Sequence, residues 1–504
     1  MRAEMFDLES EYTIYGNAWD VFHLVSFGTL QYQSHGAISP MITCDCNGDA
    51  KYVHDIYLKN MPKADYYGRF KFHGEVNMFS ELDNAKHLQF KKMINGLYSK
   101  SAIYNPKNIT RNIVVEKVRE LVKQVYLSSV SGQQPDYRSA ESKLNPYGKG
   151  SRVGSGSWYR PSEKGTGIGI DVLSLFTSFA MDVVTAFELG PQNGTNVLQE
   201  RDQSSIFEPF RMVGAMVAWS TQLPSLWYWA AGPEVRAAAQ EIEDWQLGLY
   251  EVAEKNVPEK SPHQNLTTLE AFKANGVLGP RAYSNISDNI LAGHDATSLH
   301  FTYLCYELSR PSHSDWQVKV RDEIRAEFGS PSTLEECIDD FERVDKLSYV
   351  EAVVQESLRV HAFGFMDRRT STNYDVDING KKVTLPPGTG ISCQVHLMHR
   401  VEKIFPQPNT WNPQRWLQNK EESAEEYAGR LKEMQRYMLP FGKGQRMCIG
   451  YQLGVVEIKM ALSNLYWRYK SALCSDWCDI TPAEKGGDVQ IVDEFAPGTT
   501  DEIM

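Results

Sequence analysis

The chain has 504 residues, of which 42% are hydrophobic and 23% are charged, so it is long and apolar enough to bury a large core. Its formal net charge of −12 argues against a nucleic-acid partner. Eight unevenly spaced cysteines do not form a disulfide framework and indicate a reducing compartment. We expect an N-terminal segment with short strands over 1–55 and a single, mostly helical domain over 56–504.

The first 55 residues contain no predicted transmembrane anchor. Their longest apolar stretch, residues 21–30, is interrupted by His23 and falls far short of the ~20 residues that a spanning helix needs. Acidic residues crowd the first eleven positions, which is unlike a cleaved signal peptide. Residues 36–40 and 45–49 are typical of turns between short strands.

A helix that carries His87 and Lys91 is predicted first, and a long loop and a second helix follow it. His87 and Lys91 are four residues apart and therefore share a face of the first helix. Lys86 and Lys92 are close to them in sequence, so this face is a candidate solvated basic surface. Residues 129–169 are rich in glycine, serine and proline, which predicts an exposed loop. Apolar residues at helical spacing predict the second helix over 170–190.

Residues 207–249 are unusually aromatic. Trp227, Tyr228 and Trp229 are consecutive, and three consecutive side chains cannot all face one core. This segment therefore predicts a substrate-access or membrane-surface role, with ordinary core packing as the alternative.

A long helix is predicted over 283–309, and it contains the sequence A-G-H-D-A-T at residues 292–297. Ala292 and Gly293 are small enough to let a flat ligand approach the backbone, and they loosen the helix locally. Asp295 is a carboxylate in an otherwise apolar stretch, which is costly unless it has a partner or transfers a proton. A solvent-facing aspartate is the alternative interpretation.

Glu356 and Arg359 lie three residues apart in a helix predicted over 347–363, and so they share a face. Such a pair is common on protein surfaces. The pair is informative only together with the motifs that follow it in the chain. These are the sequence N-P-Q-R-W at 412–416, which contains Arg415, and a glycine-rich loop at 441–450.

That loop has the sequence F-G-K-G-Q-R-M-C-I-G, and a helix is predicted directly after it, from Tyr451. Cys448 therefore lies at or just before a helix N-terminus, where free amide donors and the helix dipole favour a thiolate. A buried, inert cysteine beside a glycine turn is the alternative, and it suits Cys305, Cys337 and Cys393 better.

The ten residues match F-G-x-G-x-R-x-C-x-G at every fixed position, which is the signature of the cytochrome P-450 family of haem-thiolate monooxygenases. The resemblance extends from about Asp55 to about Trp467. It implies a mainly α fold with small β-sheets, in which haem b (iron protoporphyrin IX) lies between the oxygen-binding helix at 283–309 and the helix after the cysteine loop.

The resemblance also implies roles for individual residues. Cys448 is the axial ligand of the haem iron, and Glu356, Arg359 and Arg415 form a buried network that locks the loop beneath the haem. The residues that resemble the cofactor-binding positions are Arg446, His87, Lys91, Phe441 and either Arg368 or Arg369, with the basic groups on the haem propionates. The residues that resemble the substrate pocket are Ala292, Gly293, Ala296 and Phe363.

Asp295 matches the family's proton-relay carboxylate, whereas Ala296 occupies the position of the threonine that usually helps to protonate bound oxygen. Thr297 follows and is the predicted substitute, although it points ~100° away on a helix. A water molecule in the same role and an altered oxygen activation are the alternatives.

The implied reaction inserts one atom of O2 into a small apolar secondary metabolite of the terpenoid or polyketide class, as in filamentous-fungal members that the chain most resembles. The electrons come from a separate NADPH-dependent flavoprotein reductase, which Lys443, Arg446 and Lys459 are expected to dock. The resemblance implies the cytosolic face of the endoplasmic reticulum with a peripheral membrane contact, whereas the expected lack of an anchor suits a soluble cytoplasmic enzyme. Two other functions remain open, a haem-thiolate isomerase or dehydratase that needs no reductase and a non-catalytic haem-binding protein.

Overall fold

The computed structural model describes residues 31–32, 38–39, 41–44, 50–131, 172–200, 205–216, 231–257, 267–362, 364, 367–378 and 381–472. Its longer helices are α3 (Asn84–Ile94), α5 (Ile109–Ser131), α6 (Val172–Leu189), α7 (Phe207–Ala215), α10 (Pro233–Asn256), α12 (Pro280–Ser309), α13 (Ser314–Phe328), α15 (Ser348–Val360), α17 (Ala424–Tyr437) and α18 (Tyr451–Arg468). The shorter helices and helical turns are α2 (Ala50–Val53), η1 (His54–Leu58), η2 (Asp65–Arg69), α4 (Lys100–Ile103), α11 (Thr268–Ala274), η5 (Pro311–His313), α14 (Phe341–Val344), α16 (Val395–Met398), η6 (Pro413–Trp416) and η7 (Gly444–Arg446). The strands are β1 (Gln31–Tyr32), β2 (Ile38–Ser39), β3 (Met41–Cys44), β4 (Arg368–Arg369), β5 (Tyr374–Ile378), β6 (Lys381–Leu385) and β7 (Gly390–Cys393).

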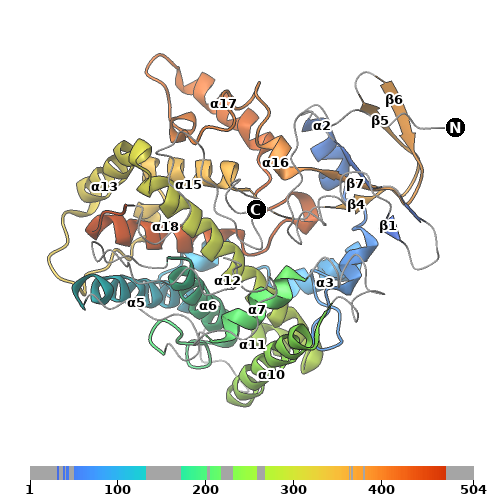
Figure 1. Ribbon diagram of the computed structural model, residues 1–504, viewed down its shortest axis with the longest axis horizontal. Coiled ribbons are helices and arrows are strands. Elements are labelled where there is room, and N and C mark those ends of the chain that lie inside the picture. Colours follow the sequence, from blue (N-terminus) through green and yellow to red (C-terminus); the bar gives the residue numbers. More distant parts are fainter. Residues whose placement is uncertain are drawn as a thin grey trace.

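Helix α12 crosses the middle of the helical body and packs against α6, α15 and α18 (Figure 1). Pro280 occupies its first turn, directly after Gly279, and Pro311 follows its last residues. These signals bound a helix of 30 residues, which is about 45 Å long at 1.5 Å per residue. The middle of a helix of this length lies inside the helical body, so its side chains there can take part in an internal site.

Helices α6 and α12 approach each other closely because one of them lacks a side chain at the crossing. A Cβ on Gly293 would lie 2.7 Å from Cγ2 of Val184. The rings of Phe176 and Phe301 stack across the same interface, with their centroids 4.0 Å apart. Helix α6 is long and apolar enough to cross a membrane, but 94% of that stretch is buried inside the protein. It is therefore explained as a core helix.

The β-strands form small sheets at one side of the helices, next to α2 (Figure 1). β3 pairs in parallel with β7, β7 pairs antiparallel with β4, and β5 and β6 form an antiparallel pair. The short strands expected near the N-terminus are therefore present. The first predicted turn, 36–40, is wrong in part because Ile38–Ser39 is strand β2, and the second, 45–49, lies outside the described residues.

The helices predicted from apolar spacing are present with small shifts at their ends. Those predicted over 170–190, 283–309 and 347–363 correspond to α6, α12 and α15. The mainly α fold with small β-sheets is confirmed. Residues 132–171, which hold most of the predicted loop, and 217–230, with the consecutive aromatic residues, lie outside the described part of the chain.

Candidate active site

The cysteine loop before α18 is fixed by its own backbone and by η1. The N–H of Cys448 donates to the carbonyl of Phe441 over 2.9 Å. Gly442 and Gly444 have φ angles of 68° and 76°, a left-handed conformation that favours glycine. A Cβ on Gly444 would collide with the carbonyl oxygen of Tyr57. The loop can adopt this shape against η1 because glycine occupies position 444.

Replacing Gly444 with alanine is therefore expected to destabilise the protein. The left-handed conformation alone costs an alanine about 1–2 kcal/mol, and the collision with Tyr57 adds to it. We expect the midpoint of urea unfolding to fall. Gly429→Ala is the matched control, because Gly429 lies in α17 and a Cβ there would meet nothing within 4 Å. That control should raise the midpoint slightly. Equal midpoints for Gly444→Ala and the wild type would contradict the steric argument.

The thiol of Cys448 faces an enclosed space rather than the outer surface. Its side chain is accessible, yet burial among protein atoms raises the pKa of the thiol. An atom can be both accessible and desolvated only where it faces a hollow inside the protein. The backbone N–H groups of Gly450 and Tyr451 and the charge of Lys91 act in the opposite direction and favour the thiolate. The predicted amide donors at the start of α18 are thus present at the sulfur.

Five basic residues from distant parts of the chain gather near this space: Lys63, His87, Lys91, Arg368 and Arg446. Burial lowers the pKa of His87 to about 3, and the charges of the other four lower it further. Burial and the charge of Arg368 lower the pKa of Arg446 to about 10. Among the described residues, Nδ1 of His87 has no hydrogen-bond partner. The two lysines and two arginines therefore repel one another and keep His87 neutral, around a place where an anion would be stabilised.

Individual members of this cluster have different partners. Arg446 donates to Oδ1 of Asn84 (3.0 Å) and to two backbone carbonyls near the start of α3. Lys91 donates to the carbonyls of Gln445 (2.9 Å) and Met447 (3.1 Å), so it binds the cysteine loop itself. Arg368 is buried in the cluster, over the ring of Tyr57. Arg369 instead forms an ion pair with Asp65, so of the two predicted arginines only Arg368 joins the cluster.

These residues fit the haem that the resemblance implies. A haem carries two propionate groups, and the buried cations, with an unpaired His87 nitrogen among them, match that charge. The accessible, amide-flanked sulfur of Cys448 matches an iron ligand. Lys63 belongs to this cluster but was missed by the sequence analysis, because nothing near it in sequence distinguishes it from a surface lysine.

The middle of α12 presents small side chains to accessible space. Ala292 is exposed and Ala296 is partly exposed, whereas His294, Thr297 and Ser298 of the same helix are buried. The predicted pocket positions Ala292 and Ala296 thus share one face, because they are one turn apart. Gly293 differs: the missing Cβ points at Val184 of α6, so we assign its small size to helix packing rather than to ligand approach. Phe363 lies outside the described residues.

The two predicted catalytic residues do not lie together on that face. Asp295 is partly exposed, and its role as a proton relay stays a prediction. Thr297 is 8% exposed, and its Oγ1 lies 3.5 Å from where a Cβ of Gly454 would be, so it faces α18. Its hydroxyl is therefore turned away from the face of Ala292 and Ala296. The structure does not support Thr297 as the substitute for the missing threonine.

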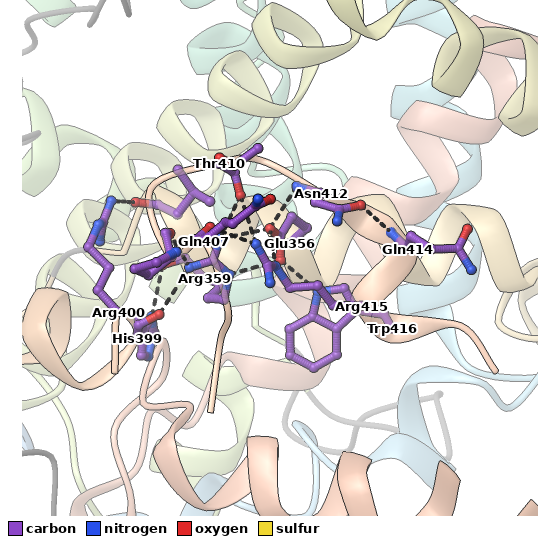
Figure 2. Close-up of polar contacts among 12 residues, drawn as sticks. Glu356, Arg359, His399, Arg400, Gln407, Thr410, Asn412, Gln414, Arg415 and Trp416 are labelled. Atoms are coloured by element: carbon purple, nitrogen blue, oxygen red, sulfur yellow. Dashed lines mark hydrogen bonds and ion pairs between the residues drawn. The ribbon is translucent and has the colours of Figure 1, made fainter. Parts of the chain in front are cut away.

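The predicted ion-pair network is present (Figure 2), and its central pair, Glu356 and Arg359, is completely buried. Arg359 donates to both carboxylate oxygens of Glu356, over 2.9 and 2.7 Å. Arg415 (3.1 Å), the indole N–H of Trp416 (2.9 Å) and the backbone N–H of Asn412 (2.8 Å) donate to the same carboxylate. Glu356 and Arg359 are 0% exposed. The charge of Glu356 is compensated by Arg359 of α15 itself and by residues 412–416, which ties α15 to η6.

His399 extends this network to the cysteine loop. Its Nε2 accepts the N–H of Leu439 over 2.7 Å, so the proton is on Nδ1, which donates to the carbonyl of Arg359 over 3.1 Å. Burial lowers the pKa of His399 to about 3. The ring therefore stays neutral, so that one nitrogen can accept a hydrogen bond while the other donates one. Leu439 lies two residues before Phe441. His399 therefore links the Glu356 network to the loop that carries Cys448, a link that the sequence did not reveal.

Comparisons with known proteins agree with this architecture. The family model for cytochrome P450 matches residues 157–492, more than half of the chain. Cytochrome P450 3A12 of Canis lupus familiaris is 28% identical over 213 residues, which cover 42% of this chain and 38% of that relative's length. Two fungal proteins match over longer stretches. Cytochrome P450 monooxygenase FGM1 of Gibberella zeae is 21% identical over 443 residues (84% of this chain, 77% of the relative). Cytochrome P450 monooxygenase avaI of Aspergillus versicolor is 24% identical over 415 residues (80% and 87%). Together with the cysteine loop and the Glu356 network, the family match establishes that this chain belongs to the cytochrome P450 family.

Proposed function

We propose that this chain is a haem-thiolate monooxygenase in which Cys448 binds the iron of haem b. The observation that carries this proposal is the accessible sulfur of Cys448, which faces an enclosed space near a cluster of buried cations. The overall reaction consumes a substrate C–H bond, O2, two electrons and two protons, and yields an alcohol and water. When bound, the haem supplies the oxidising chemistry.

The chain's own residues would position and insulate that chemistry. The N–H groups of Gly450 and Tyr451 hold negative charge on the sulfur. Arg446, Arg368, Lys63 and His87 would hold the propionates, since the three cations form no ion pair among the described residues and Nδ1 of His87 has no hydrogen-bond partner there. Ala292 and Ala296 leave room above the cofactor. Asp295, partly exposed on the same helix, is the proposed proton carrier.

The test is the absorption spectrum of the haem-loaded, reduced protein with carbon monoxide. A thiolate ligand is expected to give a strongly red-shifted Soret band, whereas a thiol or another ligand would not. Substrate-dependent consumption of O2 and NADPH with an added reductase is the second measurement. A Soret band without the shift in freshly reduced protein would refute the assignment of Cys448.

The substrate is proposed to be a small apolar secondary metabolite of the terpenoid or polyketide class. Support comes from the aromatic side chains of α7 beside α12: the rings of Phe207 and Phe210 lie 6.3 and 5.1 Å from that of His294. His294 is buried and its Nδ1 bonds to the carbonyl of Ile290, so this corner is predominantly apolar.

The proposed electron donor is a separate NADPH-dependent flavoprotein reductase. Lys459 cannot help to dock it, contrary to the sequence-based expectation, because Lys459 is buried and pairs with Asp345 and Glu351. Lys86 and Lys92 are exposed on α3, the helix that Lys91 ties to the cysteine loop. With Lys443 they make the more suitable basic surface for an acidic flavoprotein.

Lys91 is expected to tune the iron as well as to hold the loop. Lys91→Met removes two hydrogen bonds to the loop and a positive charge near the sulfur. The midpoint potential of the bound iron should then fall by about 60 mV, the equivalent of a tenfold change in a one-electron equilibrium. Redox titration measures it. Lys91→Arg should retain most of the wild-type potential, and Lys92→Met, on the exposed side of α3, should leave it unchanged. A potential equal to the wild type in Lys91→Met would contradict this role.

One observation favours a second candidate function, a haem-thiolate isomerase or dehydratase that needs no reductase. Neither Ala292 nor Ala296 supplies a hydroxyl on the accessible face of α12, and Thr297 is turned towards α18. A site without that hydroxyl is less suited to protonating bound oxygen. Product formation by the haem-loaded protein without NADPH or reductase would identify this activity.

A further inference from the structure

Asp288 is a carboxylate of α12 that the proposed mechanism does not use. It precedes Ala292 by one helical turn and so lies on the same face of the helix. Its neighbours in sequence are engaged elsewhere: Ser287 bonds to His73 and Tyr250 over 2.9 and 2.8 Å, and Asn289 donates to Glu188 over 3.1 Å. Within the described part of the chain, no hydrogen bond or ion pair is formed by Asp288. It is therefore the polar side chain that this turn of α12 leaves unpaired.

Asp288 shares its face of α12 with Ala292 and Ala296, which are exposed and partly exposed. Asp288 is partly exposed, yet burial raises its pKa to about 7, the combination of accessibility and desolvation found at Cys448. Asp288 thus faces the space in which a substrate would lie, one turn from Ala292.

The cation whose charge acts on this carboxylate, Lys63, does not form an ion pair with it. The charge of Lys63 lowers the pKa of Asp288, but its ammonium group donates to the carbonyl of Phe79. The same group lies 4.1 and 3.7 Å from the ring centroids of Tyr67 and Phe79. Lys63 is therefore held by other partners. A desolvated carboxylate without a hydrogen-bonded partner is costly, and a ligand that brings a positive charge would remove that cost.

We propose that Asp288 anchors a positively charged nitrogen of the substrate, whose apolar skeleton lies along Ala292 and Ala296. The proposal rests on the proposed function and refines it: the substrate is an apolar molecule that carries a basic amine. A cation is favoured over a hydroxyl group because it compensates the desolvated charge of the carboxylate, whereas a hydroxyl group donates a hydrogen bond and leaves that charge in place. The protein's net charge of −12 also favours the approach of cations.

The experiment compares two ligands of the same shape. The haem-loaded protein is dialysed to equilibrium against phenethyltrimethylammonium and against its carbon isostere, in which a quaternary carbon replaces the nitrogen. The ammonium keeps its charge at every pH and cannot coordinate iron, so its binding reports on the carboxylate alone. The variants are Asp288→Asn, Asp288→Glu and, as a control for net charge, Asp322→Asn on the exposed face of α13.

Asp288→Asn is expected to lose about tenfold or more in affinity for the ammonium ligand while its affinity for the isostere is unchanged. Asp288→Glu should retain most of the preference, and Asp322→Asn should match the wild type. An unchanged ratio of the two affinities in Asp288→Asn, or no measurable ammonium binding to the wild type, would overturn the proposal. The spectrum of the reduced protein with carbon monoxide, recorded on the same samples, separately reports whether the thiolate assignment holds.

Discussion

Glu356→Gln is expected to lower the free energy of unfolding by about 3–5 kcal/mol, the cost of leaving buried charges without their partner. The carboxylate accepts hydrogen bonds from Arg359, Arg415 and Trp416, and it is 0% exposed. A glutamine keeps the shape but not the charge, so two arginines would remain buried and uncompensated. Urea unfolding followed by circular dichroism measures the loss.

The same substitution should also weaken haem retention. His399 connects Arg359 to Leu439, so loosening the network loosens the loop that carries Cys448. The matched control is Glu433→Gln, which breaks an exposed ion pair with Arg436 in α17. Exposed ion pairs contribute little to the free energy of unfolding, so this control should have the urea midpoint of the wild type. Equal midpoints for Glu356→Gln and Glu433→Gln would show that burial does not set the importance of the network.

Cys448→Ser is expected to abolish both the red-shifted Soret band of the reduced carbon monoxide complex and any monooxygenase turnover. A serine hydroxyl has a far higher pKa than a thiol, so the amides of Gly450 and Tyr451 cannot hold it ionised at neutral pH. The cation cluster is unchanged by the substitution, so some haem should still bind through its propionates. Haem content and spectrum therefore separate ligand loss from cofactor loss.

The control for Cys448→Ser is the same chemical change at Cys337, a partly buried cysteine in the segment before α14 whose sulfur donates to the carbonyl of Ile338 over 3.5 Å. Cys337→Ser should keep the wild-type spectrum and turnover. Wild-type absorbance and turnover in purified Cys448→Ser would sink the assignment of this cysteine as the iron ligand.

Local sequence was sufficient for the elements whose signals are local. The helices over 170–190 and 283–309 follow from apolar residues at helical spacing, and the proline at position 280 and glycine at 279 bound α12 within three residues of the predicted start. Glu356 and Arg359 share a face because they are three residues apart in one helix. The loop around Cys448 was recognisable because its glycines and cysteine have fixed spacing.

Contacts between distant segments could not be predicted in the same way. Gly293 is small because Val184 of α6 crosses there, and Thr297 faces α18 because of the way α12 is rotated about its axis. The lysine at position 459 looked like a surface cation beside the cysteine, but the fold buries it against two carboxylates. Each of these outcomes depends on which helix packs on which face, and the sequence of one helix does not specify that.

By itself the sequence determined the mainly helical class, the family and the cysteine on which the proposed chemistry depends, because periodicity, turn residues and motif spacing act within a few residues of one another. Only the tertiary structure decided which cations gather near that cysteine, how His399 joins the Glu356 network to its loop, and that Asp288 is left without a partner one turn from Ala292. The physical reason is that burial, charge compensation and desolvation are properties of a three-dimensional neighbourhood, and residues far apart in the chain supply it.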